Sequence, residues 1–144
     1  MRTFLAVAVS LGVAVPAGVQ PAPDPHALLQ EADRLAWLRA WSQAEAQFTQ
    51  AQQLFTSRGD TRNALYAEVS ALRARLPRLS VPDVSAKLTE YLEQPLVQQD
   101  DHLRLRCLVI KGETDEDLDP MLTGAAWKEA LALAEKLGEH GWAN

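Results

Sequence analysis

The stretch RAWSQAEAQFTQAQQLFTSRGD, residues 39–60, decides the fold. Its apolar residues are spaced so that they share one face of a helix: Ala44, Phe48, Ala51 and Leu54. Two antiparallel helices approach closely where small side chains leave room, and Phe48 would fill the hole between them. Trp41 is expected to seal the preceding turn, and Gly59 marks the end of the helix. The stretch therefore predicts the second helix of a helical hairpin.

The same pattern recurs near the end of the sequence. Each of four residues has a counterpart 79 positions later: Phe48 and Trp127, Ala51 and Ala130, Leu54 and Leu133, Gly59 and Gly138. Half of this shift is about 40 residues, and it moves Phe48 onto Leu88 in another apolar, helix-like segment. A period of about 40 residues is typical of stacked helical hairpins.

The rest of the chain also favours helix. Ala and Leu dominate its hydrophobic residues, and both are strong helix formers. Asp24 followed by Pro25 is a helix-start pattern, and Gly59, Pro77 and Pro95 should each end a helix. We predict six helices, over about 25–38, 42–56, 61–76, 84–93, 100–111 and 120–137, with a further helix beginning at Trp142.

Composition and charge limit the classes of function. A chain of 144 residues, 47% of them hydrophobic, suits one globular domain with its own core. The net charge of −5 argues against nucleic-acid binding, which needs a basic surface. The single cysteine, Cys107, excludes an internal disulfide, and its apolar neighbours predict a buried, unreactive side chain.

The first twenty residues differ from the rest. Arg2 precedes an apolar run over 4–15, which is too short to span a bilayer comfortably and is followed by small residues. This is the layout of a secretory signal peptide, with cleavage expected after Ala17 and a periplasmic or secreted mature protein. An uncleaved N-terminal membrane anchor is the alternative. Residues 18–25 then form a Pro-rich linker.

Residues 26–144 resemble a known repeat family. Several residues fall at the spacing of a tetratricopeptide repeat: Leu28, Ala32, Leu35, Trp41, Ala44, Phe48 and Ala51. The connector RGDTRNAL (58–65) resembles that of the longer bacterial repeats of about 40 residues, and 125–144 looks like a second copy. Residues 61–94 match less well. The resemblance implies an all-α domain of antiparallel hairpins stacked as an α-solenoid, with three hairpins and the start of a fourth. An unrelated helical bundle is the alternative.

The resemblance also implies a function. It predicts a non-catalytic scaffold without cofactors that binds a protein or peptide on its concave face, where the first helix of each hairpin lies. The residues expected to face that groove are His26, Leu29, Asp33, Ala36, Trp37, Asn63, Ala67 and Ser70. The alternative is that these are ordinary surface positions.

The sequence contains no pattern that predicts catalysis or a metal centre. Asp115, Asp117 and Asp119 alternate as in a calcium loop, but Pro120 stands where the loop needs glycine. An acidic loop before the N-terminus of the next helix is the simpler interpretation. The histidines lack zinc-ligand spacing. Trp37 and Trp41 could form a platform for a sugar or another small molecule, although packing in the core and turn is favoured.

The end of the chain raises a second functional hypothesis. Stacked hairpins usually finish with a polar capping helix, whereas the face around Trp127 is apolar. This end could mediate self-association. Alternatively, the chain is an N-terminal accessory or sensor segment of a larger exported enzyme or signalling protein.

Overall fold

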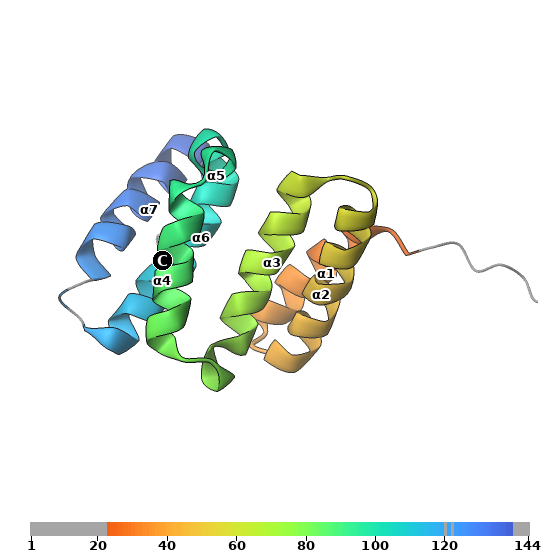
Figure 1. The fold of residues 1–144 in the computed structure, drawn as a ribbon, viewed down its shortest axis with the longest axis horizontal. Helices are drawn as coiled ribbons and strands as arrows, with labels where there is room; N and C mark the ends of the chain where they lie inside the picture. Colours follow the sequence, from red (N-terminus) through yellow and green to blue (C-terminus); the bar gives the residue numbers. More distant parts are fainter. Residues whose placement is uncertain (1–22, 120, 122, 140–144) are drawn as a thin grey trace, which may run out of the picture.

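The computed structural model describes residues 23–119, 121 and 123–139. Every regular element in this part of the chain is helical, which confirms the all-α prediction (Figure 1). The elements are α1 (Pro25–Trp37), α2 (Trp41–Ser57), α3 (Thr61–Arg75), the 3-10 turn η1 (Leu76–Arg78), α4 (Val81–Glu93), α5 (Pro95–Gln99), α6 (Asp101–Leu118) and α7 (Thr123–Leu137).

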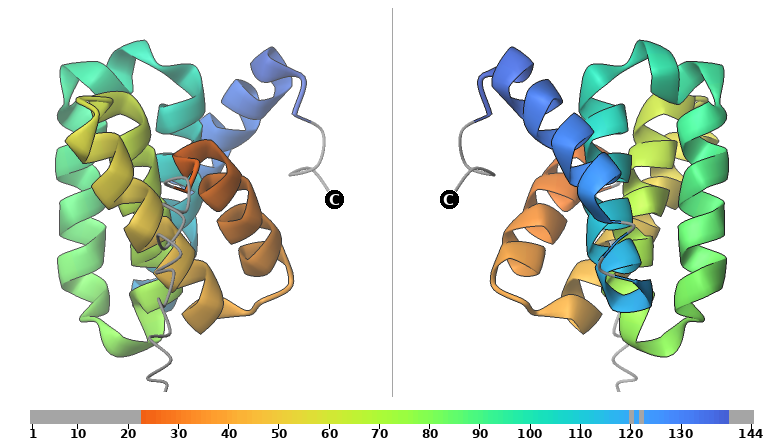
Figure 2. Two further views of the ribbon diagram at one scale, coloured as in Figure 1. Left: turned by 90° about the vertical axis from the view of Figure 1, so that its right-hand side faces the viewer. Right: turned by 90° about the vertical axis from the view of Figure 1, so that its left-hand side faces the viewer.

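The helices form two groups that meet at α3 and α6. Helix α2 packs against both α1 and α3, and α6 packs against both α4 and α7. Figure 1 shows α1, α2 and α3 at one end of the molecule and α4 to α7 at the other. Contacts between α3 and α6 join the groups. Helices α1 and α7 incline in opposite directions when viewed along the molecule (Figure 2).

Glycine ends two helices in the same way. Gly59 and Gly138 have φ values of 73° and 70°, in the left-handed region that favours glycine. After α2, the amide of Asp60 donates to the carbonyl of Phe55 at 3.0 Å, and the residues 79 positions later repeat this bond at 2.9 Å. Such bonds satisfy carbonyl groups that the helix end leaves open. The predicted helix ends at both glycines are confirmed.

Aspartates begin three of the helices. Asp24 caps α1, which starts at Pro25 as predicted. The Asp60 carboxylate accepts a hydrogen bond from the amide of Asn63 at 3.1 Å, and Asp100 accepts one from Leu103 at 2.8 Å. These caps begin α3 and α6 at positions 61 and 101, so two helix starts of the same kind lie 40 residues apart.

Four apolar clusters stabilise the helices, and the smallest contains Ala51, Phe55 and Ala67 between α2 and α3. The first lies between α1, α2 and α3 and contains Phe48 among buried alanines. The second joins α3, α4 and α6 around Leu88, and the third joins α6 to α7. Phe55 is 1% exposed, so Phe55 rather than Leu54 completes the buried face of α2. Cys107 is fully buried, and burial raises the pKa of its thiol to about 12.

Several predicted boundaries were wrong. Helix α4 begins at Val81 rather than position 84, because Pro82 is tolerated in the first helical turn. Pro95 does more than end α4: it begins the short helix α5, which the sequence analysis missed. Helix α6 continues to Leu118, so the acidic run belongs to its last turn.

The correction to α6 changes the interpretation of the three aspartates. Asp115 is buried inside α6, Asp117 lies in its last turn and Asp119 caps its C-terminal end. They therefore do not form a loop in front of α7. Within residues 23–119, 121 and 123–139, no group of three or more His, Cys, Asp or Glu side chains could hold a metal ion.

Some predictions concern residues outside the described ranges. These are the signal peptide (1–17), most of the Pro-rich linker and the helix expected at Trp142. Among the helices that the structure does describe, none has the length and apolar character needed to cross a membrane.

Candidate binding groove

A groove of about 850 Å³ lies where α1, α3 and α6 converge. Helix α1 contributes Asp33, Ala36 and Trp37, α3 contributes Tyr66 and Arg73, and α6 contributes Arg106 and Glu113. Arg39 and Trp41 border it at the α1–α2 turn, and Leu76 and Pro77 border it after α3. Three helices that are distant in sequence therefore build one site.

A buried arginine forms the base of the groove. The Arg106 side chain is 8% exposed, and its Nη2 donates to Oδ1 of Asp33 at 2.7 Å. Its Nε donates to the hydroxyl of Ser70 at 2.8 Å, and its guanidinium lies 5.2 Å from the centre of the Tyr66 ring. Contacts to α1 and α3 thus hold this cation of α6 in place, and Asp33 balances its charge.

A second ion pair crosses the groove from α3 to α6. Nη2 of Arg73 lies 2.5 Å from a carboxylate oxygen of Glu113, and its guanidinium lies 4.9 Å from the centre of the Trp41 ring. Arg73 and Glu113 are 40 residues apart, and Asp33 precedes Arg73 by the same distance. Three groove residues at intervals of 40 positions therefore carry charges of alternating sign: Asp33, Arg73 and Glu113.

Exposed side chains of the α1–α2 turn form the rim. Trp37 is 81% exposed and Leu38 is 59% exposed. Arg39 is also exposed, and its φ of 57° lies in the left-handed region. The side chain of Arg39 has no hydrogen-bond or ion-pair partner among the described residues. This rim therefore presents two apolar side chains and one uncompensated positive charge.

Burial shifts the pKa values of two groove residues. Burial raises the pKa of the Asp33 carboxyl, while the charge of Arg106 acts in the opposite direction. Burial also raises the pKa of the Tyr66 phenol, so its hydroxyl stays protonated at neutral pH and can donate a hydrogen bond. The groove offers ion pairs, hydrogen bonds and aromatic contacts.

Three of the eight residues predicted for the groove line it. These three residues, Asp33, Ala36 and Trp37, all belong to α1. The exposure of Trp37 shows that the favoured interpretation of this residue as core or turn packing was wrong. Trp41 is partly buried against the first apolar cluster, as expected for a residue at the turn.

The other five predicted residues lie elsewhere. His26 packs edge-on against Phe55, Leu29 packs against the core, and Asn63 donates to the capping Asp60. Ala67 is fully buried in the cluster with Phe55. Ser70 is 1% exposed and contributes only indirectly, by accepting the hydrogen bond from Arg106.

Four groove residues were not predicted, although a regular spacing relates them to predicted positions: Tyr66, Arg73, Arg106 and Glu113. A shift of about 40 residues maps Asp33 onto Arg73 and Glu113. The same shift relates Tyr66 to Arg106. All four lie 40 or 80 positions after a residue predicted for the groove, either His26 or Asp33.

A Ser–Lys–Asp cluster outside the groove resembles a catalytic arrangement. Nζ of Lys111 donates to the hydroxyl of Ser85 at 3.0 Å and lies 3.1 Å from a carboxylate oxygen of Asp115. The Ser85 hydroxyl itself donates to Asp115 at 2.5 Å. The Ser85 hydroxyl donates its hydrogen to Asp115, so this hydrogen does not point at Lys111 as it would if the lysine were an activating base. The cluster instead joins α4 to α6.

Comparison of the chain with protein-family models, with curated proteins and with solved structures found no match.

Proposed function

We propose that this protein is an exported, non-catalytic interaction scaffold that binds a peptide or a segment of a protein in the groove between α1, α3 and α6. The observation that carries the proposal is the rim residue Trp37, 81% exposed beside a cavity of about 850 Å³. Tryptophan and arginine are the residues most enriched at the energetic centres of protein interfaces. Trp37, Trp41, Arg39 and Arg73 gather at this groove.

We further propose that α1–α2, α3–α4 and α6–α7 are three hairpins of a tetratricopeptide-like solenoid. The equivalent caps of α3 and α6 and the equivalent glycine ends of α2 and α7 support this assignment. The first helices of these hairpins, α1, α3 and α6, are the helices that line the groove. Concave surfaces of this type bind extended partners in repeat proteins.

Export is the part of the proposal that rests on sequence alone. The charged start, apolar run and small residues of 1–17 support a cleaved signal peptide. The test is the intact mass of the native protein in each cell fraction. A mass matching 18–144 outside the cytoplasm supports export, whereas an uncleaved cytoplasmic protein contradicts it.

Binding is best tested with a library of random peptides displayed on phage and selected on the purified protein. Selected peptides should lose at least about tenfold in affinity for the Trp37→Ala variant, which corresponds to about 1.4 kcal/mol. Leu131→Ala is the matched control, since it truncates an exposed apolar side chain on α7 instead. Equal losses in both variants, or none in either, would contradict binding in the groove.

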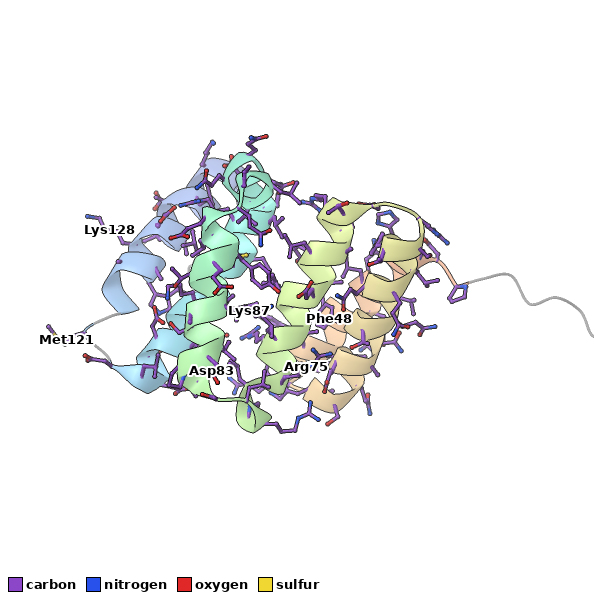
Figure 3. The ribbon with its side chains drawn as sticks, viewed as in Figure 1. Phe48, Arg75, Asp83, Lys87, Met121 and Lys128 are labelled. Carbon is purple, nitrogen blue, oxygen red and sulfur yellow. The ribbon has the colours of Figure 1, made fainter. Side chains whose placement is uncertain are left out.

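The far end of the molecule favours a second candidate function, self-association. Exposed apolar side chains gather at the end of α6 and on α7: Leu118, Met121, Trp127 and Leu131. Met121 and Lys128 project away from the helices there (Figure 3). Sedimentation of the wild type and of Leu131→Glu tests this candidate. A concentration-dependent dimer that the substitution abolishes supports it, and a monomer at all concentrations contradicts it.

A further inference from the structure

The turn between α1 and α2 has an arginine where glycine would be expected. The amide of Arg39 donates to the carbonyl of Ala36, and the next amide reaches back to Leu35. The same two bonds end α2 and α7, and in those turns Gly59 and Gly138 occupy the position of Arg39. All three residues have positive φ, which is unfavourable for a residue that carries a side chain. The backbone geometry of this turn therefore gives no reason for arginine.

The side chain of Arg39 does not stabilise the described structure through polar contacts. It is exposed, and it lines the groove without an ion-pair partner among residues 23–119, 121 and 123–139. Strained residues that persist without a structural role are concentrated at binding and catalytic sites. This places the function of Arg39 in the groove.

The charges around the groove indicate the chemistry of the ligand. Arg106 is paired with Asp33, and Arg73 is paired with Glu113, so these four charges balance. Arg39 leaves one positive charge uncompensated, in a chain whose net charge is −5. An arginine guanidinium binds a carboxylate through two parallel hydrogen bonds. The groove is therefore complementary to an anionic group.

The neighbours of Arg39 indicate that the ligand also carries an apolar group. Trp37 and Leu38, 81% and 59% exposed, stand beside it in the same turn. We propose that the turn Trp37–Arg39 recognises an Asp or Glu side chain next to an apolar residue in a peptide bound in the groove. This inference rests on the proposed peptide-binding function and names the class of peptide.

The test compares peptide selection on three proteins: the wild type, Arg39→Gln and Arg58→Gln. Glutamine at position 39 removes the charge without relieving the positive φ, so the turn has the same strain. Arg58 is an exposed arginine at the end of α2 that does not line the groove, which makes its substitution the matched control. Peptides selected by the wild type and by Arg58→Gln should be enriched in an acidic residue beside an apolar one. Arg39→Gln should still select peptides but lose the acidic preference.

One selected peptide is then synthesised in three forms: unchanged, with Gln or Asn in place of its acidic residue, and with an amidated C-terminus. The wild type should bind the peptide with Gln or Asn at least about tenfold more weakly than the unchanged peptide, and it should bind the amidated peptide as tightly as the unchanged one. Arg39→Gln should bind the unchanged peptide and the peptide with Gln or Asn equally. Added salt should weaken binding of the unchanged peptide to the wild type more than to Arg39→Gln.

Three results would overturn the inference, and they differ in what they say of the groove. Peptides without an acidic preference, or an identical preference in Arg39→Gln, would refute acidic recognition while leaving peptide binding intact. Loss of binding on amidation alone would assign the recognised carboxylate to the peptide C-terminus instead of a side chain. Failure of all three proteins to select any peptide would refute both this inference and the proposed function.

Discussion

Replacing Arg39 by glycine should stabilise the protein, although it removes a long side chain. With φ at 57°, Arg39 lies in a region where residues with a side chain are destabilised by about 1–2 kcal/mol. Glycine avoids this penalty but loses more freedom on folding, which costs about 0.5–1 kcal/mol. The Arg39 side chain has no polar partner in the described part of the chain, so little else is lost. The expected balance is a stabilisation of about 0.5–1 kcal/mol.

The assay is urea unfolding followed by circular dichroism. The free energies of unfolding are compared using one common slope of free energy against urea concentration. Arg58→Gly is the matched control because Arg58 has φ −94° at the end of α2, where no strain is relieved. This control should destabilise the protein by about 0.5–1 kcal/mol, so the two substitutions should have opposite signs. If Arg39→Gly destabilises the protein as much as Arg58→Gly, then Arg39 contributes packing energy, and the argument that it serves binding fails.

Three further predictions concern other parts of the fold. A Cβ atom on Gly112 would lie 2.6 Å from the indole of Trp127, so Gly112→Ala should destabilise the protein by about 1 kcal/mol in urea unfolding. In a Trp127→Ala background the same substitution should instead stabilise α6, and the absence of this sign change would refute the contact. A hydrogen bond from Arg62 lowers the pKa of Asp100 in the folded protein. The ion pair therefore stabilises the protein fully above the unfolded-state pKa of about 3.9. This stabilisation disappears as the pH falls through the lower pKa of the folded state. The stability difference between the wild type and Asp100→Asn should therefore be about 1 kcal/mol at pH 7 and vanish in acid, whereas a difference independent of pH would exclude the ion pair as its source. Finally, burial raises the pKa of Cys107 to about 12, so iodoacetamide should modify it at pH 8 only in denaturant, and rapid modification of the native protein would contradict its burial.

Local sequence patterns determined the helices and most of their ends. Asp24 with Pro25, Gly59 and Asp100 act within one or two turns, since a cap or a left-handed glycine satisfies backbone groups only a few residues away. For this reason the sequence also indicated two equivalent helix ends, at Gly59 and Gly138, which lie 79 residues apart. It failed where the local pattern was ambiguous, as at Pro95, which can either follow one helix or start the next.

The groove was decided by tertiary structure. Its base forms between Asp33 and Arg106, which are 73 residues apart, and no local pattern relates them. Trp37 and Ala67 were both predicted for one groove, yet Trp37 lines the groove and Ala67 is fully buried against α2. Helical periodicity shows which residues share a face, but the angles at which helices pack determine whether that face meets a neighbouring helix or solvent. Those angles arise from side-chain packing across the whole domain, and the groove became visible only when α1, α3 and α6 were placed together.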